Sequence, residues 1–120
     1  MLADDYHKGW ALRYIREAKD ELKISMKTSR PMDFIVDAAR KAQASIYYVL
    51  GDPSSIGSLV NELSDKTNFV KNPVLQCLVS IEQTILLIEN MPVSARNEAL
   101  EKAEKIVWIA TEIINELSQD

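Results

Sequence analysis

SARNEALEKAEKIVWIATEIINEL, residues 94–117, repeats apolar side chains at alternating steps of three and four residues. This is the spacing at which side chains return to one face of an α-helix. Ile106, Ile109 and Ile113 widen that face, so that about half of the helix surface is apolar. The pattern predicts a long helix that packs against several neighbours. The strictly spaced positions are Leu100, Ala103, Val107, Ala110, Ile114 and Leu117.

The preceding stretch, PVLQCLVSIEQTILLIEN at residues 73–90, is apolar on nearly every side of a helix. Such a helix is buried nearly all round. A bundle of 120 residues does not need two helices of this kind for its own core, so the surplus predicts a partner chain, most simply a second copy. The alternative is that a short helix and the N-terminal segment cover the surplus. The residues expected to face a second copy are Val79, Leu86, Ile106, Trp108, Ile109 and Ile113.

Trp108 falls among charged residues on the outer side of its helix. An indole in that position is typical of an interface anchor. It also occurs where the ring lies over the edge of a bundle with its N–H in water. Both interpretations stay open from the sequence.

Proline and glycine divide the first half of the chain into segments of helical length. One helix is expected over residues 7–26 and a second over residues 31–50. Ser29 is a candidate cap for the second helix, and Gly51 is expected to end it.

The second half of the chain adds one short helix, expected over residues 55–64, and the two apolar helices. Asn72 and Ser94 are the expected caps of the apolar helices. No segment shows the alternation of a strand. The sequence therefore predicts one all-α domain over residues 1–120, an up-and-down bundle of four long helices plus one short connecting helix.

Composition excludes several classes of protein. One cysteine excludes a disulfide scaffold, and one histidine excludes the usual zinc sites. No run of about 18 uncharged apolar residues is present, so no membrane span is expected. Cys77 alone in an apolar segment favours a reducing cytoplasm. The formal net charge of −4 is unlike that of a typical nucleic-acid module, although residues 1–50 hold nine Lys and Arg against seven Asp and Glu.

Basic side chains form a stripe along the first helix, opposite its apolar face. Such a stripe can track a phosphate backbone. However, Arg13 with Glu17 and Arg16 with Asp20 are pairs four residues apart, which is typical of a solvated helix surface.

Tyr47 and Tyr48 leave the apolar face of the second helix and lie beside two cations. They either stack bases or anchor a protein partner, or they pack on a neighbouring helix with their hydroxyls outward. The candidate binding surface from both helices is Arg13, Arg16, Lys19, Lys23, Arg40, Lys41, Tyr47 and Tyr48.

Catalytic motifs are missing from the sequence. It contains no glycine-rich phosphate loop, no C-x-x-C and no H-E-x-x-H. His7 is expected at the surface, and Cys77 is expected to be a small core residue rather than a nucleophile. No catalytic, cofactor-binding or metal-ligating residue is assigned, and no cofactor is expected.

One carboxylate pattern keeps an enzyme alternative open. Glu17, Asp20 and Glu21, with Asp33 and Asp37, resemble the acidic residues of all-α nucleoside-triphosphate pyrophosphohydrolases, which bind magnesium. That family places E-E-x-x-E and E-x-x-D on neighbouring helices, whereas this chain has E-x-x-D-E and D-x-x-x-D.

Three stretches resemble the HEPN family (higher eukaryotes and prokaryotes nucleotide-binding domain). YIREAKDEL at residues 14–22, with Trp10, is similar to its first helix; residues 38–51, with AARKA and YYVLG, to its second; and NEALEKAEKI at residues 97–106 to its last. The resemblance implies a helical bundle, often dimeric, that binds nucleotides or RNA, often beside a nucleotidyltransferase. Catalytic members carry an arginine followed a few residues later by a histidine. Because no arginine precedes His7, the resemblance implies a non-nuclease member used for binding or assembly.

The leading hypothesis is a cytoplasmic, non-catalytic, homodimeric interaction module. The first alternative is a nucleic-acid- or nucleotide-binding protein, whose affinity would fall steeply with salt. The second is a magnesium-dependent nucleotide hydrolase. The sequence is silent on the pathway and on the role of residues 51–71.

Overall fold

The computed structural model describes residues 4–64 and 71–118, and these form an all-α fold, which confirms the predicted class. Within the described residues there is no strand. The helices are α1 (Asp5–Ser25), α2 (Pro31–Leu50), α3 (Pro53–Leu63), α4 (Pro73–Glu89) and α5 (Arg96–Ser118), with a 3-10 turn, η2 (Val93–Ala95), before α5.

Polar side chains fix where several helices begin. Asp4 accepts a hydrogen bond from the backbone N–H of His7 at 2.8 Å, and this contact caps α1. Asn72 accepts from the N–H groups of Val74 and Leu75, as the sequence predicted for α4. Each side chain satisfies N–H groups that have no partner within the helix.

Three predicted details of the helix starts were wrong, although α2 spans the predicted residues 31–50. Ser29 does not cap α2, because Arg30 is the capping residue and makes no side-chain bond there. The short helix begins at Pro53, two residues earlier than expected, because Asp52 caps it and proline suits a first turn. Ser94 lies inside the 3-10 turn rather than at the start of α5.

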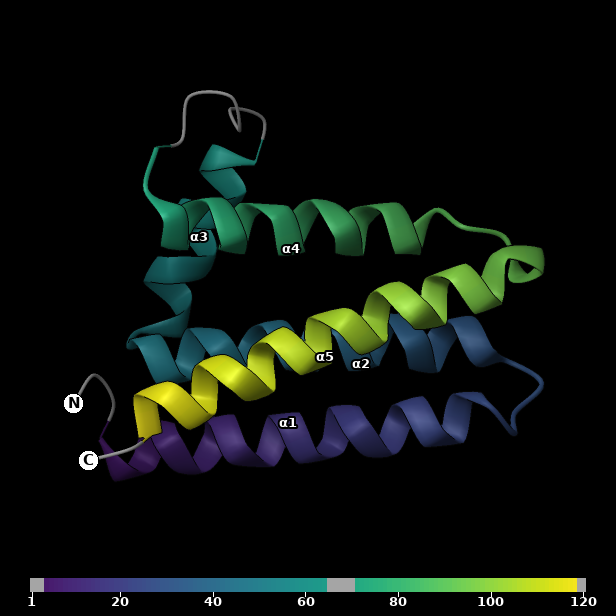
Figure 1. The fold of residues 1–120 in the computed structure, drawn as a ribbon, viewed down its shortest axis with the longest axis horizontal. Coiled ribbons are helices and arrows are strands. Elements are labelled where there is room, and N and C mark those ends of the chain that lie inside the picture. The colour runs from purple at the N-terminus through teal and green to yellow at the C-terminus, as the bar shows by residue number, and fades with distance from the viewer. Residues whose placement is uncertain (1–3, 65–70, 119–120) are drawn as a thin grey trace.

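Fully buried alanines line the contacts among α1, α2 and α5. Small side chains allow two helix backbones to approach closely, and larger isoleucines fill the remaining space. Figure 1 shows α5 in front of α2, with α1 and α4 on opposite sides of this pair. The buried alanines are Ala11, Ala18, Ala38, Ala39, Ala42, Ala99, Ala103 and Ala110.

An ion-pair network connects α4 to α2. Arg40 donates from Nη1 to Oε1 of Glu82 at 2.8 Å and from Nη2 to Oε1 of Glu89 at 2.9 Å. Gln43 donates to the same Glu82 oxygen at 2.7 Å. The Glu82 side chain is only 8% exposed, so its charge depends on these two donors.

Within the described residues, none of the helices combines the length and the apolar character that crossing a membrane requires.

Arg40→Met should lower the free energy of unfolding by about 3 kcal/mol, because it leaves the Glu82 carboxylate buried without its cation. The double variant Arg40→Met with Glu82→Leu should recover most of that loss. Urea denaturation followed by circular dichroism measures both. Arg30→Met is the matched control, since it breaks an ion pair with Asp33 whose side chains are 79% and 61% exposed, and it should cost less than about 1 kcal/mol. A loss for Arg40→Met no larger than for the control would contradict the role given to the network.

Candidate interaction surfaces

A groove follows the line where α4 and α5 diverge, and we call it the α4–α5 groove. Its wider part has a volume of about 490 Å³ and lies where α4 begins and α5 ends. Its narrower part, of about 220 Å³, continues toward the middle of both helices, and Cys77 borders both parts. The apolar residues of the two parts are Leu50, Val74, Cys77, Leu78, Ile81, Ile106, Ile109, Ile113 and Leu117.

Charged residues on α5 border the groove, with opposite signs at its two ends. Glu112 and Glu116 border the wider part, and Lys102 and Lys105 border the narrower part. Within the described part of the chain, none of these four side chains forms an ion pair. Their charges are therefore available to a partner molecule.

Trp108 lies on the outer face of α5 and is 63% exposed. Ile109 and Ile113 are half-buried and line the groove beside it. Of the six residues expected to face a second copy, Ile106, Ile109 and Ile113 line the groove, and Trp108 lies next to Ile109 on the exposed side of α5.

Three of the six self-association candidates offer no exposed contact at the groove. Val79 is fully buried and Ile106 is 3% exposed, so neither is available to a second copy in the way the sequence suggested. In addition, α3 packs against α4, with Val60 of α3 fully buried, and so covers part of the apolar surplus. Leu86 is exposed, but nine helical steps from Cys77 place it on the opposite side of α4 from the groove.

The predicted binding surface does not form one continuous patch. Arg40 is engaged by Glu82 and Glu89, and Lys41 by three carboxylates. Tyr47 is buried, and burial together with the charge of Glu82 raises its pKa to about 12. The rest of the predicted surface consists of the exposed stripe on α1 and the half-buried Tyr48 of α2. The residues of the stripe are Arg13, Arg16, Lys19 and Lys23.

The basic stripe of α1 is partly paired. Arg13 binds Glu17 at 2.9 Å, as the four-residue spacing predicted, but the expected pair of Arg16 with Asp20 is not formed. Among the described residues, Lys19 and Lys23 also lack ion-pair partners. Nucleic-acid binding by this stripe stays a prediction.

A cluster of aromatic rings, which was not predicted from the sequence, joins α1 to α2. Tyr48 stacks on Tyr14 at a centroid distance of 5.6 Å and on Trp10 at 6.3 Å. Tyr6 meets the edge of Trp10, and the Arg13 guanidinium lies 5.0 Å from the centre of a Trp10 ring. The four-residue spacing of Tyr6, Trp10 and Tyr14 was the available signal.

The carboxylates of the hydrolase alternative do not form one acidic centre. Glu17, Glu21 and Asp37 converge on the ammonium group of Lys41, which contacts all three. Asp20 is exposed, and Asp33 pairs with Arg30. In the described residues no group of His, Cys, Asp and Glu is arranged to hold a metal ion. The lysine thus takes the position that a cation would need among these carboxylates.

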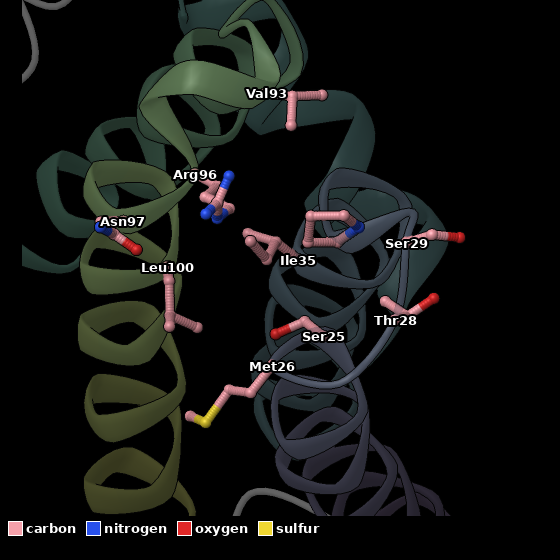
Figure 2. A pocket seen from close by; sticks show the side chains of 10 residues that line it. Ser25, Met26, Thr28, Ser29, Ile35, Val93, Arg96, Asn97 and Leu100 are labelled. Carbon is pink, nitrogen blue, oxygen red and sulfur yellow. The ribbon is translucent and has the colours of Figure 1, made fainter.

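Another pocket, of about 440 Å³, lies between the turn that joins α1 to α2 and the start of α5. Figure 2 shows Arg96, Asn97 and Leu100 on the α5 side of it, and Ser25, Met26 and Ser29 on the side of the turn between α1 and α2. Both polar and apolar side chains line the pocket. Ser25 is buried there, but its hydroxyl already donates to the backbone carbonyl of Leu22 in its own helix. It presents exposed side chains, Arg96 among them, rather than a set of buried ligand-binding groups.

Comparison of the chain with protein-family models, with curated proteins and with solved structures found no match. The resemblance to the HEPN family therefore stays a prediction.

Glu21 is the side chain whose titration should affect stability near neutral pH. Burial raises its pKa to about 7 from an ordinary 4.5, and the nearby Asp37 carboxyl acts in the same direction. A hydrogen bond with Glu21 and the charge of Lys41 lower the pKa of Asp37. The folded protein binds the Glu21 proton more tightly than the unfolded chain does, so protonation of Glu21 stabilises the fold. This contribution to the free energy of unfolding is fully present below pH 4.5 and is lost as pH rises through 7.

Glu21→Gln should remove this dependence. Between pH 5 and 7.5 the wild-type free energy of unfolding should fall by about 1 to 2 kcal/mol relative to that of the variant, after allowance for partial solvent exposure. Urea titrations at several pH values measure the difference. Glu17→Gln is the control and should keep the wild-type slope, because the pKa of Glu17 is lowered by Arg13 and Lys41. Parallel curves for wild type and Glu21→Gln would contradict the assignment.

Proposed function

We propose that the protein is a non-catalytic helical assembly module that self-associates through the α4–α5 groove and the adjoining face of α5. The observation that carries the proposal is an apolar groove that the described chain leaves open, beside an exposed tryptophan. A second helical copy would supply the apolar side chains that such a groove lacks.

The interior of the groove supports a protein partner rather than a small polar ligand. Its wider part is lined by aliphatic side chains, while its charges belong to exposed residues of α5 at the border. An apolar centre with a charged rim is the usual composition of a protein–protein interface. Tryptophan is one of the residue types that most often contribute a large share of the binding energy of such an interface, and Trp108 is exposed beside the groove.

A catalytic function has less support. Four of the five carboxylates that the magnesium alternative requires pair with Lys41 or Arg30. The cationic and aromatic residues of the binding alternative are divided between internal contacts and the outer face of α1. By contrast, the charged residues that border the groove form no ion pair within the described part of the chain.

Light scattering of the purified protein at ~100 µM should give the mass of a dimer, since assembly follows mass action. Trp108→Ala should weaken the dimer at least about tenfold, as expected for a buried interface anchor. Tyr6→Ala is the matched control: it removes an aromatic ring that is 64% exposed on α1, away from the groove, and should leave the mass unchanged. A wild-type monomer at this concentration would overturn the proposed function.

A further inference from the structure

We infer that two copies pair through antiparallel α5 helices, related by a two-fold axis that passes between Trp108 and Ile109. This inference rests on the proposed self-association and specifies its geometry. It makes the contact self-complementary, as a closed dimer with a single kind of interface requires.

The positions of the charges on α5 define the axis. Lys105 precedes the midpoint between residues 108 and 109 by as many residues as Glu112 follows it, which is about 5 Å in each direction along the helix. In an antiparallel pair Lys105 therefore faces Glu112 of the partner subunit, and the same contact occurs twice. A parallel arrangement would instead place like charges level with each other, which is unfavourable.

The exposure of these residues agrees with that geometry. At 100° per residue, Lys105, Trp108 and Glu112 fall within about 60° of one another, and all three are exposed. Because neither Lys105 nor Glu112 has an ion-pair partner among the described residues, pairing with a second copy breaks no salt bridge within the chain.

Apolar contacts fill the centre of the same arrangement. Trp108 faces Ile109 of the partner subunit, and the partner's α5 lies over the opening between α4 and α5. The four helices α4 and α5 of both copies then surround one apolar interior, as in a four-helix bundle. Farther from the axis the charges do not decide the arrangement, because Glu101 is level with Glu116 of the partner subunit and Lys102 is offset from it by one residue. The test therefore uses the central pair.

The test is a mixing experiment with the full chain, by sedimentation equilibrium at low salt. Lys105→Glu alone and Glu112→Lys alone each place like charges opposite each other twice, so each variant should dimerise at least about tenfold more weakly than wild type. An equimolar mixture of the two restores both pairs and should dimerise like wild type. The double variant Lys105→Glu with Glu112→Lys should do the same by itself.

Controls separate this inference from the proposed function. A mixture of Lys19→Glu with Glu98→Lys reverses exposed charges away from the central pair and should match its separate components. Circular dichroism confirms that each variant is folded. A wild-type dimer whose single charge reversals dimerise as well as wild type, with no gain on mixing, would overturn the antiparallel geometry and leave the proposed function intact. A wild-type monomer would overturn both.

Discussion

The contact of Arg40 with Glu82 and Glu89 determines where α4 lies, and much of the surface depends on that position. Burying the Glu82 carboxylate is unfavourable unless a cation and further donors reach it, and Arg40 and Gln43 of α2 supply them. The network thus holds α4 against α2 by polar contacts with defined geometry. It gives α4 one orientation, which apolar packing alone specifies less well.

The open groove follows from this attachment. The alanines of α2 and α5 bring those helices close together. By contrast, α4 contributes larger side chains to the core, Ile85 and Ile88 among them, and pairs with α2 through long polar side chains. The apolar sides of α4 and α5 that face each other therefore diverge and leave a hollow of about 490 Å³ at one end. The same arrangement leaves Trp108 on the surface, on a face where Lys105 and Glu112 are spaced symmetrically about the midpoint between residues 108 and 109.

The helices themselves were predictable because their signals are local. Apolar periodicity, the cap at Asn72 and the stop at Gly51 each depend on a few neighbouring residues. The full burial of Val79 was not predictable, because it depends on how helices from distant parts of the sequence pack together. The roles of Arg40 and Lys41 depend on acidic partners more than 15 residues away in the sequence. An isolated glutamate in the apolar helix, Glu82, was the one sequence signal for that network.

The central claim is that the α4–α5 groove is covered when two copies meet. Cys77 reports on this directly, because it is the single cysteine of the chain, is half-buried and borders both parts of the groove. The most direct measurement is the rate at which a thiol reagent modifies Cys77 as protein concentration rises through the dimerisation range, at a fixed alkaline pH because burial raises the pKa of this thiol. The account predicts that the rate per molecule falls as the dimer forms and stays high for Trp108→Ala. A rate that does not change while the protein dimerises would show that the groove is not the interface.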